Sequence, residues 1–129
     1  MRNNDKEWEN PYRLVTKKMK ENIPKFYETD NMKPKDYVVQ GIFFVPFRSS
    51  FTWYLVEYDE ERNEGYGLVA GDEVEWGYFS FDELKEIRAQ RLVAFEPMTF
   101  TEMKDTELKK QITEAELGRA FSNTIKFKD

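Results

Sequence analysis

The sequence contains no cysteine and no histidine among its 129 residues. The absence of Cys excludes a disulfide framework, a thiolate nucleophile and zinc sites built on Cys ligands. The absence of His removes the commonest general base, so a Ser or Thr nucleophile would have to rely on Lys, and no motif indicates such a pair. These absences favour a protein that is not an enzyme and holds no metal or cofactor.

Long apolar stretches are absent as well. The longest apolar run, residues 42–45, is far too short to cross a membrane. The polar stretch MRNNDKEWENPYRL at the start has no apolar segment typical of a signal peptide. We therefore expect a cytoplasmic protein that does not act at a membrane.

Aromatic and acidic residues, in contrast, are plentiful. Hydrophobic residues make up 40% of the chain and include eleven Phe, enough for one domain to bury a core without disulfides. Residues 57–86 contain eleven Asp and Glu but only two basic residues, a net charge of −9 against −5 for the whole chain. Such an acidic region disfavours direct binding of nucleic acid, because Lys and Arg are needed to neutralise phosphates. It favours a basic protein partner, including one that itself binds nucleic acid.

The apolar patterns predict an α+β fold. We expect an antiparallel meander of four to five strands with helices packed on one side, followed by a C-terminal helix. Strands are expected at residues 37–45, 51–58, 66–70, 74–79 and 92–95. Strict alternation within the second strand should place Glu57 beside Trp53 on one face and Tyr58 beside Tyr54 on the other.

Helix starts are also visible in the sequence. Thr16 and Ser80 are typical N-cap residues, and the helix that follows Ser80 should point Ile87 inward. A last helix is expected to begin at Thr101 or Asp105.

These patterns divide the chain into three parts. Residues 1–13 form an N-terminal arm, residues 14–103 form a single α+β domain, and residues 104–129 form the C-terminal helix and a tail. A chain of this length fits one domain.

Aromatic rings are interleaved with carboxylates throughout residues 51–84. The candidate anchors for a partner are Trp53, Tyr54, Tyr66, Trp76 and Tyr78. Rings on a sheet stack nucleic-acid bases in some proteins, but those proteins supply basic neighbours and this region is acidic. Tyr and Trp also dominate protein–protein interfaces. We expect half or more of these rings to pack in the core and the remainder to form an interface on one face.

Carboxylates of the same region are the second candidate group. Glu57, Asp59, Glu73 and Glu75 could pair with Arg and Lys of a partner. An alternative is that two or three of them converge, to hold Mg²⁺ or to act as general acid and base. No spacing typical of a metal-binding loop is present, so solvated charge at loops and sheet edges is favoured over a metal site.

The order and spacing of several short motifs resemble one protein family. The chain carries Val15-Thr16-Lys17, Pro24-Lys25-Phe26-Tyr27, Phe43-Phe44, Thr52-Trp53-Tyr54 with Glu57 and Asp59, Gly67-Leu68-Val69 with Gly71, Glu73 and Glu75, and Gly77-Tyr78-Phe79-Ser80 with Glu83-Leu84. This pattern resembles a family of small bacterial proteins of conjugative elements, plasmids and phage-like regions, known only as a domain of unknown function. The resemblance covers residues 14–103 and departs from the family at Trp76, where a smaller aliphatic residue is usual.

The resemblance implies an interaction role. No catalytic activity is known for the family, and some similar proteins are linked to CRISPR effector nucleases as anti-CRISPR proteins or accessory modulators of Cas9. We therefore expect a non-catalytic acidic module that binds and modulates a nucleic-acid-handling protein, with a Cas9-type nuclease as the suspected partner.

Other interpretations stay open from the sequence alone. The main alternative is a small carboxylate- or metal-dependent enzyme that acts on a nucleotide-like ligand, and a third is a DNA mimic. A homodimer is also expected to be possible, because exposed rings are costly to leave uncovered.

Overall fold

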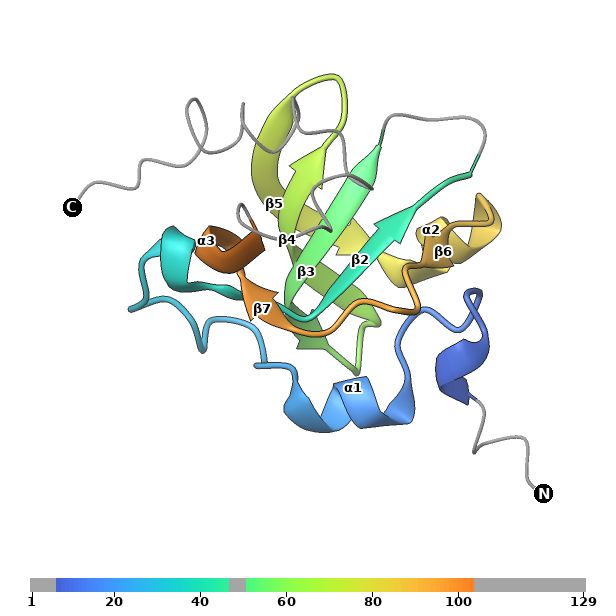
Figure 1. The fold of residues 1–129 in the computed structure, drawn as a ribbon, viewed down its shortest axis with the longest axis horizontal. Coiled ribbons are helices and arrows are strands. Elements are labelled where there is room, and N and C mark those ends of the chain that lie inside the picture. The colour runs from blue at the N-terminus through green and yellow to red at the C-terminus, as the bar shows by residue number, and fades with distance from the viewer. Residues whose placement is uncertain (1–6, 47–50, 104–129) are drawn as a thin grey trace.

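Five strands form the central sheet of the computed structural model, which describes residues 7–46 and 51–103 (Figure 1). The strands are β2 (Gly41–Phe44), β3 (Thr52–Asp59), β4 (Glu64–Ala70), β5 (Val74–Ser80) and β6 (Gln90–Arg91). They are all antiparallel and lie in the order β5-β4-β3-β2-β6. The predicted α+β class is confirmed, and so is the meander, which runs from β2 to β5 before β6 returns to pair with β2.

Two further strands and several short helices complete the fold. β1 (Val38–Val39) pairs with β7 (Met98–Thr99) in a separate small sheet. The helices are α1 (Lys17–Asn22), the 3₁₀ helix η2 (Pro34–Asp36), α2 (Phe81–Glu86) and α3 (Phe100–Met103). Within the described ranges, no helix has the length and apolar character needed to cross a membrane.

Two predicted strands differ from the structure. The strand expected at residues 37–45 is interrupted at Gln40, and its two halves belong to different sheets. The strand expected at residues 92–95 is wrong. After one hydrogen bond from the Leu92 amide to the Ile42 carbonyl the chain turns, and Phe95 N–H bonds the carbonyl of Leu92. Leu92 and Phe95 pack against the first core, although this segment does not pair as a strand. A short apolar run looks the same in the sequence whether its residues pair as a strand or only pack as a loop.

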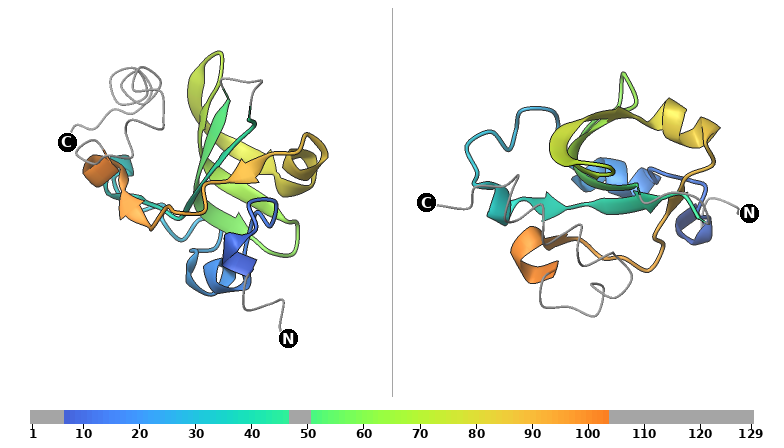
Figure 2. Two further views of the ribbon diagram at one scale, coloured as in Figure 1. Left: turned by 45° about the vertical axis from the view of Figure 1, so that its right-hand side comes forward. Right: turned by 90° about the horizontal axis from the view of Figure 1, so that it is seen from above.

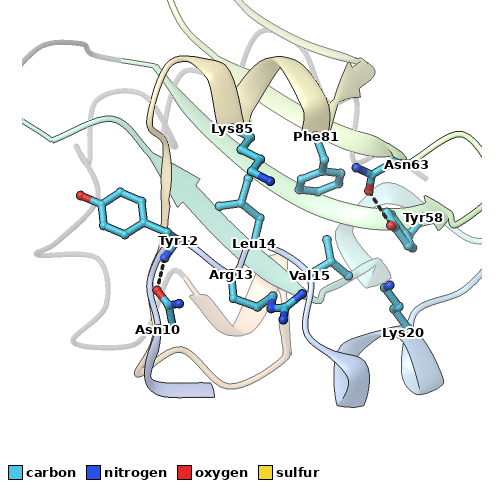
Figure 3. Close-up of a pocket in the computed structure, with 10 residues that line it drawn as sticks. All are labelled: Asn10, Tyr12, Arg13, Leu14, Val15, Lys20, Tyr58, Asn63, Phe81 and Lys85. Atoms are coloured by element: carbon cyan, nitrogen blue, oxygen red, sulfur yellow. Dashed lines mark hydrogen bonds between the residues drawn. The ribbon is translucent and has the colours of Figure 1, made fainter. Parts of the chain in front are cut away.

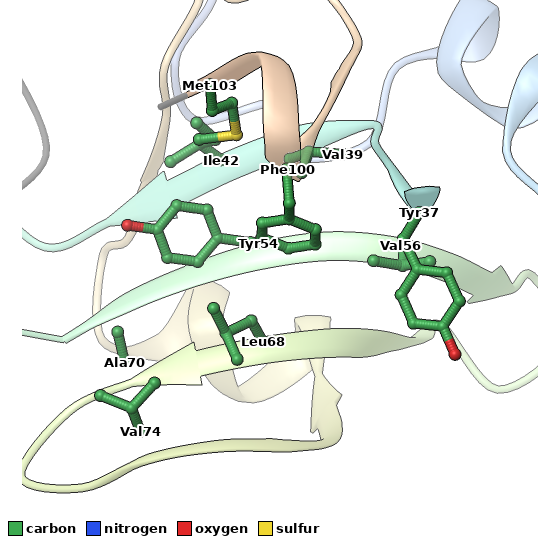
Figure 4. Close-up of a cluster of buried hydrophobic side chains, with 10 residues drawn as sticks. All are labelled: Tyr37, Val39, Ile42, Tyr54, Val56, Leu68, Ala70, Val74, Phe100 and Met103. Atoms are coloured by element: carbon green, nitrogen blue, oxygen red, sulfur yellow. The ribbon is translucent and has the colours of Figure 1, made fainter. Parts of the chain in front are cut away.

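The sheet is buried on both faces. The first core consists of Tyr37, Val39, Ile42, Tyr54, Val56, Leu68, Ala70, Val74, Phe100 and Met103 (Figure 4). The second core consists of Leu14, Val15, Ile23, Phe43, Trp53, Leu55, Tyr58, Phe81, Leu84 and Ala89. Helix α3 covers the first core, whereas α1 and α2 lie on the other side of the sheet (Figure 2). The prediction that the helices pack on one side is therefore wrong, because both faces of the sheet are apolar and each needs a cover.

The predicted helix starts are confirmed. The hydroxyl of Thr16 accepts a hydrogen bond from the amide of Met19 at 3.1 Å, and that of Ser80 accepts one from the amide of Glu83 at 3.2 Å. The inward orientation of Ile87 is wrong, because α2 ends one residue earlier and leaves this side chain 49% exposed. Helix α3 begins at Phe100, close to Thr101, one of the two expected starts of the last helix, and the C-terminal helix expected within residues 104–129 lies outside the described residues.

A β-bulge in β3 overturns the predicted alternation. The pairing of β3 with β4 shifts by one residue between Leu55 and Glu57, so Val56 is an extra residue on its strand. Beyond it the side chains exchange faces. Tyr58 packs in the second core, and Glu57 lies opposite Tyr66 beside the first core. The bulge therefore decides where the candidate site residues of this strand lie.

The described part of the N-terminal arm is packed onto the domain through Arg91. This guanidinium is 6% exposed and donates hydrogen bonds to the carbonyls of Glu7, Trp8, Asn10 and Arg13 at 3.4, 2.9, 3.2 and 3.2 Å. The Arg91 amide also bonds the carbonyl of Pro11 at 2.7 Å. Burial lowers the pKa of Arg91, and the charge of Glu7 opposes that effect. Residues 7–13 thus belong to the folded domain.

Candidate protein-interaction surface

The edge strand β5 carries the exposed part of the predicted aromatic set. Within the described part of the chain, β5 pairs with β4 alone, so no strand covers its outer edge. Trp76 and Tyr78 lie opposite Leu68 and Tyr66 of β4. Tyr78 is 55% exposed, and both Trp76 and Tyr66 are half-buried. These three rings therefore line one face of the sheet at its edge.

Two rings from the loop after α1 extend this group. The ring of Phe26 meets that of Tyr78 edge-on, with centroids 5.2 Å apart, and Tyr27 lies 6.0 Å from Phe26 with 64% exposure. Tyr66 lies 4.9 Å from Tyr78 and stacks on Trp76 at 6.3 Å. We call Phe26, Tyr27, Tyr66, Trp76 and Tyr78 the aromatic surface.

The aromatic surface is fixed to the first core at its inner end. Trp76 contacts the buried rings of Tyr37 and Phe100 edge-on, with centroids 5.4 and 5.5 Å apart, and Phe100 in turn contacts Tyr54 at 6.1 Å. Such edge-to-face contacts add to the stability that burial gives. Rings held in this way lose little conformational freedom when a partner binds them.

Two predicted anchors lie in the core instead. Tyr54 is fully buried in the first core, and Trp53 is 8% exposed in the second. A partner of the folded domain cannot use either ring as an anchor, so both leave the candidate site. Tyr58 packs in the second core as well, so three of the six rings Trp53, Tyr54, Tyr58, Tyr66, Trp76 and Tyr78 are buried, which agrees with the expectation that half or more of the aromatic set is core.

Glu57 is a buried carboxylate that holds the loop after α1. Its side chain is 2% exposed, and Oε1 accepts a hydrogen bond from the amide of Tyr27 at 2.9 Å. Oε2 accepts one from the amide of Thr29 at 3.0 Å and another from the hydroxyl of the same residue. Tyr27 has a φ of 75°, a costly conformation for a bulky residue, which these bonds maintain. Glu57 therefore positions the aromatic surface and is not itself available to a partner.

The other predicted carboxylates lie apart from one another. Asp59 closes the β3–β4 turn, where Oδ1 accepts hydrogen bonds from the amides of Glu61 and Arg62. Glu73 lies in the β4–β5 turn and Glu75 on β5, and both are exposed. No group of three or more Asp or Glu residues within residues 7–46 and 51–103 is arranged to hold a metal ion. Asp59 lies at the turn before β4, and Glu73 and Glu75 lie at or beyond the turn that follows it.

The hydroxyl groups of the aromatic surface lie in a negative environment. Burial raises the pKa of Tyr66 to about 12, with further contributions from Tyr37, Tyr78, Glu57 and Asp30. The pKa of Tyr78 is also raised, first by burial and then by the neighbouring hydroxyl of Tyr27. These hydroxyls therefore stay neutral at physiological pH and act as hydrogen-bond donors.

Alkaline pH is expected to destabilise the protein through Tyr66. Below the ordinary tyrosine pKa of 10 the Tyr66 hydroxyl is protonated in both the folded and the unfolded chain. The contribution of this group to the free energy of unfolding is therefore fully present there. Between pH 10 and about 12 the unfolded chain loses the proton first, and the free energy of unfolding falls as pH rises. Urea unfolding at a series of alkaline pH values measures this fall. It should be shallower in Tyr66→Phe, and an identical slope in both proteins would contradict the assignment.

Several residues of the site are not evident from the sequence. Phe26, Tyr27 and Asp30 belong to a polar loop, and they reach β5 only because Glu57 binds this loop across the sheet. The one sequence signal for this loop is the motif Pro24-Lys25-Phe26-Tyr27, which covers part of it. Its proximity to Tyr78 depends on the bulge, for which no local pattern exists.

Comparisons with known proteins found no relative of this chain. No protein-family model, no curated protein and no solved structure matches the chain. The resemblance to the mobile-element family therefore stays a prediction from the motifs.

Proposed function

We propose that this chain is a non-catalytic interaction module that binds and modulates a nucleic-acid-handling protein. The aromatic surface and the outer edge of β5 form the binding site. The observation that carries this proposal is a set of rings at the surface, fixed to the core at one end, beside the outer edge of β5, along which none of the described strands pairs. The motif resemblance makes a Cas9-type nuclease the specific partner proposed.

An unpaired strand edge and exposed rings are features that a monomer usually avoids. Open edges pair with other strands, and proteins commonly cover or interrupt them. Here β5 is seven residues long and carries Tyr78 at 55% exposure. A partner segment that adds a strand to β5 would gain main-chain hydrogen bonds, and the aromatic surface would supply side-chain contacts.

The charge beside this edge favours a basic partner. Glu73 and Glu75 are exposed along β5 and its turn, and Asp30 lies close enough to Tyr78 to raise its pKa. In residues 57–86 acidic side chains outnumber basic ones by nine. Such a field attracts Arg- and Lys-rich surfaces, which are typical of nucleases, and speeds association in a salt-dependent way.

The test is the affinity of purified chain for a Cas9-type nuclease, with Tyr78→Ser as the variant. Truncating a central aromatic anchor is expected to weaken the complex by about thirtyfold, or ~2 kcal/mol. Tyr12→Ser is the matched control, because Tyr12 is also an exposed tyrosine, at 45%, but bonds Gln90 of β6 at the opposite end of the sheet. Equal affinities of the two variants would contradict the proposed site.

Charge-reversal variants measure how much the acidic side chains contribute to partner binding, apart from the aromatic contacts. Glu73→Lys with Glu75→Lys should slow association and remove most of its salt dependence, while Glu86→Lys on α2 should change it little. Both acids are exposed, so the fold is expected to tolerate the change. Intact salt-dependent binding after the double reversal would count against a basic partner at β5.

A further inference from the structure

A basic hollow lies on the side of the sheet that α1 and α2 cover. It has a volume of about 420 Å³ and is bounded by the segment before α1, by α1 and by α2 (Figure 3). The cations that line it are Arg13, Lys20 and Lys85. Figure 3 shows the Lys85 ammonium reaching toward the hollow from above, with Arg13 and Lys20 below. Its floor consists of apolar side chains of the second core, among them Leu14 and Phe81.

The convergence of three cations is unexpected in a chain with a net charge of −5. The three residues come from three separate segments, and like charges placed together repel each other unless an anion compensates them. Lys85 forms no ion pair with any described residue. Of the three cations, Lys85 is therefore the one that pairs with no described carboxylate.

Two of the cations have carboxylate neighbours, but these contacts are loose. Arg13 Nε lies 3.7 Å from Glu7, and Lys20 Nζ lies 3.6 Å from Glu60, whose side chain is 71% exposed. The Lys20–Glu60 pair is exposed on both sides, so it contributes little energy and exchanges readily with other anions. The Arg13–Glu7 pair is partly buried, because the Glu7 side chain is 14% exposed, but the Arg13 side chain is 57% exposed and keeps a free side toward a ligand.

Among the neutral side chains around the hollow, Asn10 keeps a free donor group. The Tyr58 hydroxyl donates to Asn63 Oδ1 at 2.6 Å, and Asn63 Nδ2 donates to Asp82 at 3.0 Å, so both groups are already engaged. Asn10 Oδ1 accepts from the amide of Tyr12, which leaves its Nδ2 hydrogens directed to other acceptors. The hollow therefore offers a ligand the donors of two ammonium groups, a guanidinium and an amide.

We propose that this hollow binds a phosphate group, either as free phosphate or as the monoester end of a small organic molecule. A set of three cations and one amide donor complements a dianion with several acceptor oxygens. The volume lies in the range of small-molecule sites, and the apolar floor gives a carbon body a surface to contact. This site is separate from the aromatic surface and does not depend on the function proposed for it.

The test is a titration of the full chain with orthophosphate and with adenosine 5′-monophosphate, followed by ³¹P NMR at constant ionic strength. Both probes are expected to bind, and Lys85→Gln should weaken binding by at least about fivefold, because one charge-assisted hydrogen bond is lost. Tighter binding of the monoester would identify an organic phosphate as the ligand class, and equal binding would identify free phosphate.

Lys33→Gln is the matched control, because Lys33 is an exposed lysine that does not line the hollow. A second variant, Arg13→Gln, should weaken phosphate binding as Lys85→Gln does, and melting curves of all variants confirm that they fold. An equal loss in Lys33→Gln would show a nonspecific charge effect and overturn the site. Absence of binding to wild-type protein at about 50 mM of either probe, where even a weak site is occupied, would overturn it as well.

Discussion

Replacing Glu57 by Gln is expected to lower the free energy of unfolding by about 2–3 kcal/mol. The carboxylate accepts three hydrogen bonds, two from the amides of Tyr27 and Thr29 and one from the Thr29 hydroxyl. The amide of Gln offers one oxygen and turns its NH₂ group toward a donor, so at least one buried N–H loses its acceptor. Urea unfolding followed by tryptophan fluorescence measures the change.

The same substitution should also reduce partner binding, because Tyr27 and Phe26 lose the group that holds their loop against β5. Glu75→Gln is the control for stability, since Glu75 is exposed and its replacement should change the free energy of unfolding by less than about 0.5 kcal/mol. If Glu57→Gln were as stable as Glu75→Gln, the assignment of Glu57 as the anchor of this loop would be wrong.

Replacing Arg91 by Ala is expected to cost about 3 kcal/mol or more. Its buried guanidinium donates to carbonyls of four residues between Glu7 and Arg13. These carbonyls lose their donors in the variant, and the segment loses its main attachment to β6. Arg91→Lys should recover little of the loss, because an ammonium group cannot reach several separate carbonyls in one plane.

Two readouts distinguish this effect from a general loss of packing. Thermal unfolding gives the size of the change, and limited proteolysis should show early cleavage in residues 7–13 of Arg91→Ala. Arg62→Ala is the control, because Arg62 is exposed in the β3–β4 turn and pairs loosely with Asp59 at 3.8 Å, not with residues 7–13. Unchanged protease resistance of the segment in Arg91→Ala would contradict its role.

Local patterns in the sequence were sufficient to predict most of the sheet. Alternating apolar residues and turn residues located β3, β4 and β5 within one or two residues. The capping residues Thr16 and Ser80 located two helix starts, because N-caps depend on a hydrogen bond to a residue only three positions away. Features of this kind are encoded locally, and for that reason the sequence reveals them.

Features that depend on distant contacts were missed. The bulge at Val56 adds one residue to a regular strand, and nothing in the alternation of β3 marks it. Because of this one extra residue, the Glu57 side chain points to the face opposite the predicted one, where it binds the loop after α1. In the same way, the attachment of residues 7–13 depends on Arg91, which is 78 positions away from Arg13 in the sequence.

The candidate site was therefore predicted in part. Tyr78, Glu73 and Glu75 are exposed at the edge of the sheet, where a partner can reach them. Trp53 and Tyr54 carry the same ring chemistry but lie in the core. Composition identifies aromatic residues, whereas the pairing of strands decides which of them solvent can reach.

The central claim is that the outer edge of β5 and the aromatic surface contact a basic partner. Hydrogen exchange of the full chain, measured by mass spectrometry with and without a Cas9-type nuclease, tests this claim most directly. The account predicts that amides of β5 within residues 75–80 and of the loop around Tyr27 exchange at least about tenfold more slowly in the complex, because new main-chain hydrogen bonds protect them. Unchanged exchange in β5, or protection confined to β6 at the opposite edge of the sheet, would contradict it.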